Sequence, residues 1–239
     1  MPADSPWRPG RARLIGGLLP PSVAAAESAG RPPANSPGLF PGEEAAVRTA
    51  GPGRRAEFAA GRSCARAALA ALGVAAGPIL PGPAGQPLWP PGVTGSITHC
   101  AGYQACAVAR TTDMAAIGID AEPGAALPAG LIEAIATGPE RAWISRHVAA
   151  AALPSAAPPL CWDRLLFSAK EAAGKLWYPL TGQWPDLRDV AIGLATNGTF
   201  TACLPGPGPA NRGRPVTRMT GRWLARDGLI VTAIAWAPG

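Results

Sequence analysis

Lysine and histidine are scarce in this sequence. Of its 21 basic residues only Lys170 and Lys175 are lysines, and only His99 and His147 are histidines. Such a bias towards arginine is typical of a GC-rich genome, so two neighbouring lysines indicate a demand that the broad guanidinium does not meet. Long runs of positive charge are also missing, and the net charge of +6 is modest. These absences argue against nucleic-acid binding and favour small anions or an acidic partner.

Paired cysteines and long apolar runs are missing as well. The run from Leu14 to Leu19 is apolar, but Pro20 and Pro21 end it far short of a signal sequence or a membrane span. The five cysteines are odd in number and lack the paired spacing of metal ligands, which predicts free thiols in a reducing compartment. They are Cys64, Cys100, Cys106, Cys161 and Cys203. We therefore expect a cytoplasmic protein that does not enter a membrane.

The apolar pattern predicts a mixture of helices and antiparallel strands. Hydrophobic residues make up 48% of the 239, enough for a core in one domain or in two small fused ones. Helical spacing predicts helices over residues 54–72, 131–135, 140–152 and 163–178, and short helical pieces over 22–29 and 43–49. Alternation predicts strands over 93–110 with a break at 101–102, over 115–121, 190–194 and 199–204, and over 221–236 with a turn at Asp227-Gly228. Each half runs from a basic helix into an antiparallel sheet, so we predict an α+β fold.

Two acids follow directly after an apolar strand. Asp120 and Glu122 are two residues apart, and in an extended chain this spacing puts both carboxylates on one face. Two hard oxygen ligands at a strand end suit a magnesium ion that takes the rest of its shell from water and phosphate. An isolated pair of this kind is also typical of a solvated acidic turn.

The predicted helix over 163–178 contains both lysines and one acid. Asp163 is a candidate N-cap, and Pro179 is expected to end the helix. Glu171 and Lys175 are one helical turn apart, which alone indicates a surface ion pair worth a few tenths of a kcal/mol. A catalytic reading competes with that one, because the only two lysines of the chain flank this acid.

Hydroxyls and an imidazole gather near another strand end. Ser96, Thr98 and His99 lie within six residues, and a protonated histidine could bind phosphate with Ser96 and backbone amides. From this segment alone, a partly buried histidine bonded to backbone is the favoured interpretation. We assign His147, which follows Arg141 and Arg146 on a polar helix, to a solvated face.

Taken in order, these segments resemble the motif series of 4′-phosphopantetheinyl transferases. The resemblance is strongest to the monomeric group that includes the enterobactin-synthase transferase and actinobacterial transferases, and it spans about residues 40 to 236. It rests on residues 54–58, 61–66, 95–100, 118–123 and 167–175, with Trp89-Pro90 and Gly221-Arg222-Trp223 as further family positions.

The resemblance implies a pseudo-twofold α+β fold of two similar subdomains, each an antiparallel sheet with helices. The subdomains would comprise residues 1–113, with the nucleotide and phosphate contacts, and residues 114–239, with the magnesium and catalytic residues. Coenzyme A, the substrate, would bind in the cleft between them. The expected partner is an apo acyl or peptidyl carrier protein, and the enzyme is expected to be a monomer.

Position by position, the resemblance also implies roles for single residues. Asp120, Glu122 and Glu171 match the family's magnesium ligands. Arg54, Arg62 and His99 match residues that hold the nucleotide phosphates, with Ser96 beside them. Lys170 and Lys175 match the lysines that flank the catalytic acid, and both are expected to contact coenzyme A. Two positions depart from the family pattern: Pro81 stands where several relatives carry a basic residue, and Gly174 where the family often has an aromatic one.

The mechanism implied is transfer of 4′-phosphopantetheine from coenzyme A to a carrier serine, with release of adenosine 3′,5′-bisphosphate. The serine would attack the β-phosphorus, with Glu171 or a water on the metal as the base, and Lys175 would assist the leaving group. Two alternatives stay open. One is a relative that binds coenzyme A or a carrier without turnover, and the other is a magnesium-dependent pyrophosphate hydrolase.

Overall fold

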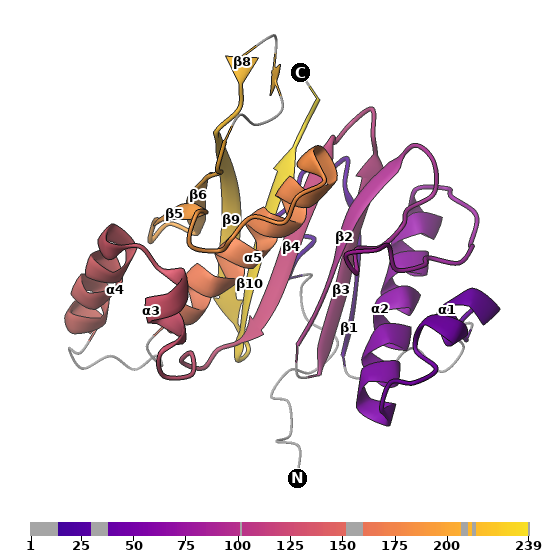
Figure 1. Ribbon diagram of the computed structural model, residues 1–239, viewed down its shortest axis with the longest axis horizontal. Coiled ribbons are helices and arrows are strands. Elements are labelled where there is room, and N and C mark those ends of the chain that lie inside the picture. The colour runs from indigo at the N-terminus through magenta and orange to yellow at the C-terminus, as the bar shows by residue number, and fades with distance from the viewer. Residues whose placement is uncertain are drawn as a thin grey trace.

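Figure 1 shows a computed structural model of the chain, which describes residues 14–29, 38–100, 102–151, 160–206, 210–211 and 214–238. Two antiparallel sheets stand side by side, and each carries its own helices. This arrangement confirms the α+β prediction. Parts of the predicted loops near the N-terminus, residue 101 of the predicted hairpin turn and residue 152 of the predicted helix lie outside the described residues.

The N-terminal sheet has three strands in the order β1-β3-β2. The strands are β1 (Ala24–Ala29), β2 (Val93–Cys100) and β3 (Tyr103–Arg110), and the helices are α1 (Pro41–Ala46) and α2 (Pro52–Ala71). Helix α2 packs against β3 and β1 through small apolar side chains such as Cys64, Ala65 and Ala68. Their spacing along one helix face is the pattern that predicted this helix.

The C-terminal sheet has five strands in the order β4-β10-β9-β6-β5. They are β4 (Ala116–Pro123), β5 (Ala191–Leu194), β6 (Thr199–Cys203), β9 (Arg218–Arg226) and β10 (Leu229–Trp236). The helices are α3 (Leu131–Ile135), α4 (Gly138–Ala151) and α5 (Trp162–Thr181), and β7 (Ala210–Asn211) pairs with β8 (Arg214–Pro215). A Cβ at Gly118 would collide with the carbonyl oxygen of Ala172, so glycine lets α5 lie directly on β4.

The two sheets meet at their outer strands β2 and β4, which lie side by side (Figure 1). Side-chain hydroxyls of β2 bind the backbone of β4 there. Ser96 Oγ accepts a hydrogen bond from the Ile119 amide at 3.2 Å, and Thr98 Oγ1 accepts one from the Ala121 amide at 3.0 Å. We call this junction the β2–β4 seam.

A shared hydrophobic core lies behind the seam. It combines Tyr103 of β3 with Ile117 and Ile119 of β4 and with Leu229 and Val231 of β10, all of them buried. Because these side chains come from both sheets, separating the halves would expose core surface in each.

The expected helical piece over residues 22–29 is wrong, because Ala24–Ala29 is strand β1. Alanine favours helices, but pairing with β3 overrides that preference. The carboxylate of Glu27 strengthens this placement, since it accepts hydrogen bonds from the Leu14 and Gly16 amides and from the Tyr103 hydroxyl.

Both expected ends of α5 need correction. Cys161 is the N-cap, and Asp163 lies in the first turn, where its carboxylate accepts a hydrogen bond from the Leu127 amide at 2.8 Å. The helix continues through Pro179 to Thr181 and ends at Gly182, whose φ of 72° is the left-handed conformation typical of helix ends. A proline in the last turn costs a single backbone bond, so it does not stop the helix earlier.

His147 does not belong to a solvated face. Its ring is half-buried and stacks on Trp143 with 3.5 Å between ring centroids, and the edge of Trp162 approaches it at 5.5 Å. The stack on Trp143 is an i,i+4 contact within α4 that the sequence could have indicated, whereas the contact with Trp162 requires the packing of α4 on α5.

All five cysteines are free, as the sequence predicts. Burial raises the pKa of the Cys64 thiol to about 11, so this group stays protonated at neutral pH. Within the part of the chain that the structure describes, every helix is too short or too polar to cross a membrane.

Candidate active site

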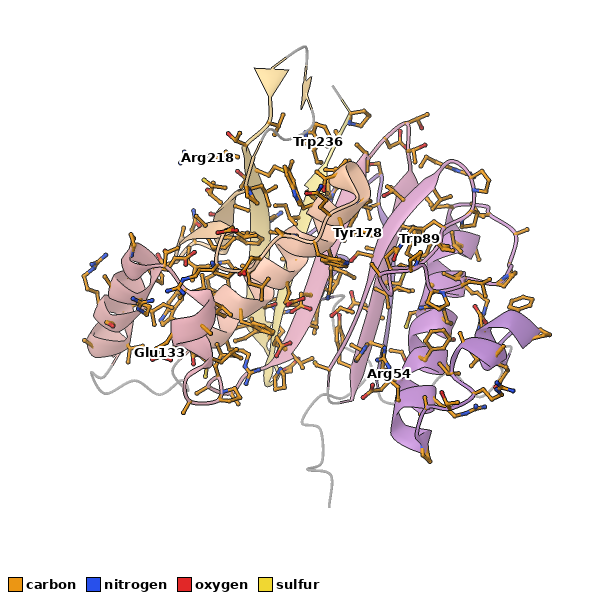
Figure 2. All side chains as sticks on the ribbon, viewed as in Figure 1. Arg54, Trp89, Glu133, Tyr178, Arg218 and Trp236 are labelled. Atoms are coloured by element: carbon orange, nitrogen blue, oxygen red, sulfur yellow. The ribbon has the colours of Figure 1, made fainter. Side chains whose placement is uncertain are left out.

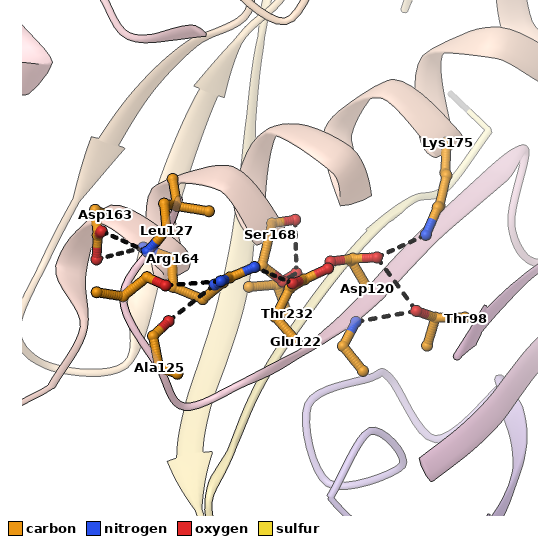
Figure 3. Close-up of polar contacts among 12 residues, drawn as sticks. Thr98, Asp120, Glu122, Ala125, Leu127, Asp163, Arg164, Ser168, Lys175 and Thr232 are labelled. Carbon is orange, nitrogen blue, oxygen red and sulfur yellow. Dashed lines mark hydrogen bonds and ion pairs between the residues drawn. The ribbon is translucent and has the colours of Figure 1, made fainter. Parts of the chain in front are cut away.

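Asp120 is the centre of the candidate site (Figure 3). Strand β4 places it against the seam, where its side chain is 6% exposed. Its Oδ1 atom accepts a hydrogen bond from the Thr98 hydroxyl at 3.2 Å and lies 2.7 Å from Lys175 Nζ. Lys175 also donates to the Ile119 carbonyl at 3.3 Å. The second oxygen, Oδ2, is buried and has no hydrogen-bond partner in the structure.

Glu122 lies two residues further along β4, on the same face as Asp120. Its Oε2 atom forms an ion pair with Arg164 of α5 at 2.8 Å. The same guanidinium donates to the carbonyls of Ala125 and Ala126, so it ties the loop after β4 to the helix (Figure 3). Burial raises the pKa of Glu122, and the charge of Asp120 adds to the rise.

Glu171 faces the same region from α5. Burial raises its pKa, the nearby negative charge of Asp120 adds to the rise, and Lys175 opposes it. Asp120 therefore interacts with both glutamates, and the three carboxylates predicted from the sequence share one side of the seam. Mutual repulsion of this kind is relieved by a cation.

The acids partly fit the magnesium ion that the resemblance implies. Three carboxylates provide the hard oxygen ligands that magnesium prefers, and the partnerless Oδ2 of Asp120 is a buried acceptor that a ligand would satisfy. In the described residues, however, no three His, Cys, Asp or Glu side chains are already clustered as a metal site. Lys175 and Arg164 occupy one oxygen each of Asp120 and Glu122, so a metal would have to share or replace these ion pairs.

A positively charged pocket of about 310 Å³ opens beside the acids. Its basic side chains are Arg54, Arg62 and His99, with Glu57 and Pro81 also in the lining. Arg54 Nη1 lies 3.0 Å from His99 Nε2, and Glu57 lies 3.5 Å from Arg54. Burial lowers the pKa of His99, so the free protein holds a neutral ring there. The three basic residues that the sequence predicts for phosphate binding therefore line one pocket, and Pro81 leaves this wall of the pocket without a cation.

Arg62 is held more rigidly than the other cations. It is 6% exposed, its Nε donates to the Ile79 carbonyl at 2.7 Å, and its guanidinium lies over the Phe58 ring at 4.1 Å. Burial lowers its pKa to about 10, which still leaves it charged at neutral pH. Its side chain lines the pocket beside Arg54 and His99.

A second pocket of about 400 Å³ continues from the first, since Gly85, Pro87 and Ile97 line both. Ser96 and Lys175 line it near the seam, and Trp89, Tyr178 and Trp184 form its aromatic part. Figure 2 shows Trp89 and Tyr178 facing each other from the two halves. The two pockets together form a groove, which we call the seam groove. Gly174 lies behind it, where an added Cβ would touch Trp184 at 3.7 Å, an ordinary contact.

Lys170 is not in this groove, although it is adjacent to Glu171 in sequence. Its side chain is fully buried on the other side of α5. Its ammonium pairs with Glu140 at 3.0 Å and donates to the carbonyls of Leu187 and Val190. The structure thus brings together Asp120, Glu122, Glu171 and Lys175, with Ser96, His99, Arg54 and Arg62 beside them, and leaves Lys170 in the core.

Sequence reasoning missed Thr98 and Arg164, which hold Asp120 and Glu122. A signal for Arg164 was present, because it lies seven residues before Glu171, which is two helical turns on the same face. Thr98 stands next to His99, and only the packing of β2 against β4 reveals its contact.

The fold and the seam groove define an α+β enzyme that acts on a phosphorylated substrate. Residues 42–109 match the 4′-phosphopantetheinyl transferase N-terminal domain, and residues 116–215 match the 4′-phosphopantetheinyl transferase superfamily. The chain is 50% identical over 200 residues to the 4′-phosphopantetheinyl transferase Svp of Streptomyces mobaraensis, covering 83% of this chain and 79% of Svp. It is 41% identical over 230 residues to the 4′-phosphopantetheinyl transferase PptT of Mycobacterium tuberculosis, covering 92% and 97%. Enterobactin synthase component D of Salmonella typhi is 43% identical over 76 residues, which are 32% and 30% of the two chains.

The chain therefore belongs to the 4′-phosphopantetheinyl transferase family, and its activity is the transfer of phosphopantetheine from coenzyme A to carrier proteins.

Proposed function

We propose that the transfer takes place in the seam groove, depends on magnesium, and uses Asp120, Glu122 and Glu171 to hold the metal. The observation that carries this proposal is the buried, partnerless Oδ2 of Asp120, whose carboxylate also helps to raise the pKa of both Glu122 and Glu171. When bound, the ion would neutralise charge on the pyrophosphate of coenzyme A.

Arg54, Arg62 and His99 bind the phosphates of the nucleotide in this proposal, with Ser96 at the edge of the groove. Their charges and their common pocket support the assignment. A phosphate would displace Glu57 from its contact with Arg54, since both anions need the same cation. The aromatic part of the groove then receives the uncharged pantetheine arm.

Glu171 and Lys175 carry the chemical step in this proposal. The carrier serine attacks the β-phosphorus, and Glu171 takes its proton. The bond from phosphorus to the bridging oxygen breaks, and Lys175 stabilises that oxygen or gives it a proton as adenosine 3′,5′-bisphosphate leaves. The contact of Lys175 with Asp120 supports this placement, because it holds the ammonium at the acid cluster.

The proposal extends to the subdomain boundary, the cellular location, the oligomeric state and the carrier. We place the division of the subdomains near residue 113, between β3 and β4, so that residues 1–113 supply nucleotide contacts and residues 114–239 the acids. The enzyme acts as a cytoplasmic monomer on an acidic carrier, and the positive net charge supports such a partner. Lys170 has no part in binding coenzyme A.

One incubation tests the proposal and separates its alternatives. The protein is mixed with coenzyme A, magnesium and an apo carrier, and the carrier is weighed by mass spectrometry. A carrier heavier by phosphopantetheine is the expected result, and chelation of magnesium or Asp120→Ala is expected to abolish the gain. Free 4′-phosphopantetheine without a modified carrier would indicate a hydrolase, and no product at all would indicate a relative that only binds. Full turnover with chelator present would overturn the metal assignment while leaving the transferase intact.

A further inference from the structure

The Thr98 hydroxyl spans the seam between the two halves (Figure 3). Thr98 belongs to β2 and is 2% exposed. Its Oγ1 atom lies 3.0 Å from the Ala121 amide and 3.2 Å from Asp120 Oδ1, so one side chain contacts both the backbone and the acid of β4.

The direction of these two hydrogen bonds is fixed by chemistry. An amide N–H only donates, so the Thr98 oxygen must accept from Ala121. A hydroxyl has a single proton, and the carboxylate only accepts, so that proton points to Asp120 Oδ1. The Ala121 amide therefore orients the Thr98 hydroxyl, and the hydroxyl in turn orients the acid.

The result is an uneven division of partners between the two oxygens of Asp120. Oδ1 receives both Thr98 and Lys175, whereas Oδ2 is buried without a hydrogen-bond partner. A buried acceptor without a partner is costly, and a cation beside Oδ2 would remove that cost. Such an oxygen is ready to bind a cation.

We infer that Thr98 is a positioning residue, which holds the Asp120 carboxylate so that Oδ2 is presented to the metal. This inference rests on the proposed function. Groups that orient a metal ligand commonly change metal affinity by about 10- to 100-fold when they are removed. Successive side chains of a strand point to opposite sides, so β2 contacts the acid with Thr98 and the nucleotide pocket with His99.

The test measures metal binding without turnover. Mn²⁺ is titrated into the whole protein in the absence of coenzyme A and carrier, and free Mn²⁺ is followed by its electron paramagnetic resonance signal. Thr98→Val, which keeps the shape and removes the hydroxyl, is expected to weaken Mn²⁺ binding by about tenfold or more. Thr98→Ser is expected to bind within about threefold of the wild type, because it restores the hydroxyl. Asp120→Asn serves as the reference for loss of the site.

Thr232→Val is the matched control. Thr232 is also fully buried, pairs with Asp120 in the sheet register, and donates to the Ser168 carbonyl at 3.0 Å, but its hydroxyl bonds are with Ser168. Thr232→Val therefore loses comparable buried hydrogen bonds but none to the acid, and Mn²⁺ affinity is expected to be unchanged. Thermal melts confirm folding, and Thr98→Ala replaces Thr98→Val should the latter fail to fold.

Three outcomes would overturn the role of Thr98: wild-type affinity in Thr98→Val, no rescue in Thr98→Ser, or an equal loss in Thr232→Val. Wild-type affinity in Asp120→Asn, or no Mn²⁺ binding by the wild type, would instead reject the metal site and the role of Thr98 with it. Transfer to an apo carrier is measured on the wild type in parallel, so a failure of the proposed function is seen separately.

Discussion

At the scale of single residues, Lys175 stands out because the chain uses arginine at nearly every other basic position. Its ammonium fits between Asp120 Oδ1 and the Ile119 carbonyl, at 2.7 Å and 3.3 Å. A guanidinium is broad, planar and effectively never deprotonated, so it would meet this geometry poorly and could not act as a proton donor. We expect Lys175→Arg to lower kcat by at least about tenfold, which is about 1.4 kcal/mol of barrier.

The measurement for Lys175→Arg is steady-state transfer to an apo carrier, together with calorimetric affinity for coenzyme A. Affinity is expected to change far less than kcat, because positive charge is retained. A near-normal kcat would mean that any cation serves at this position and that Lys175 is an electrostatic clamp.

His99 is expected to take up a proton when coenzyme A binds. Burial lowers its pKa in the free protein, so near pH 6.5 the folded ring carries less positive charge than the unfolded chain, in which histidine titrates at about 6.5. A phosphate beside the ring favours the charged form and raises the pKa again. Calorimetry in two buffers of different ionisation enthalpy is expected to show proton uptake near pH 6.5 in the wild type, and less uptake in His99→Gln.

The same depressed pKa has a consequence for stability. At a pH well above 6.5 His99 is neutral in both the folded and the unfolded state, so it does not change the free energy of unfolding there. As the pH falls through the unfolded-state pKa of about 6.5, the unfolded chain gains protons first and the folded state loses stability.

In the calorimetric test of coenzyme A binding, identical proton uptake in the wild type and in His99→Gln would remove His99 from the phosphate site.

At the scale of helices and strands, the success of sequence reasoning depended on whether a pattern was local. Helix α2 and the hairpin of β9 and β10 follow from apolar spacing and from Asp227-Gly228, where both residues adopt positive φ. Strand β1 could not be predicted, because its alanine-rich sequence favours a helix until β3 pairs with it.

The residues of the candidate site also differ in whether a local sequence pattern indicates them. Local strand and helix spacing singled out Asp120, Glu122 and Glu171 as candidates, and the family resemblance predicted them together as metal ligands. Arg164 and Thr98 contact the acids of β4 from a different helix and a different strand, and no local sequence pattern shows which loop or strand lies opposite them. Lys170 was misjudged because adjacency to Glu171 in sequence corresponds to roughly 100° of rotation on a helix, which points it into the core.

Lys170 and Glu140 fasten α4 and β5 to α5. Glu140 accepts hydrogen bonds from the Thr137 and Ile192 amides in addition to its ion pair with Lys170. Removal of one partner of a buried pair commonly costs about 3–5 kcal/mol, so Lys170→Met is expected to destabilise the fold by that order. The KM for coenzyme A of the folded protein is expected to stay unchanged.

Urea unfolding and steady-state kinetics check this prediction together, and Arg188→Met, an exposed cation near the same segment, is the control. A Lys170→Met variant with wild-type stability and a strongly raised KM for coenzyme A would return Lys170 to the nucleotide site.

At the scale of the whole molecule, the seam groove and the shared core have a common consequence. The core behind the seam draws on both sheets, so the halves are expected to unfold in a single transition. Coenzyme A and magnesium would contact side chains of both halves at the seam, and ligands that bind only the folded state stabilise it. At about 100 times the dissociation constant this amounts to about 2.7 kcal/mol, and for a chain of this length to a rise in Tm on the order of 5–10 °C. These shifts in Tm follow from ligand binding to the folded state alone.

Scanning calorimetry with and without the ligands measures the shift in Tm. Asp120→Ala is expected to lose the part of the Tm shift that requires magnesium and to keep the part that coenzyme A alone produces. Two separate transitions, with only one of them moved by coenzyme A, would show that the halves fold independently and that the nucleotide is held by one sheet.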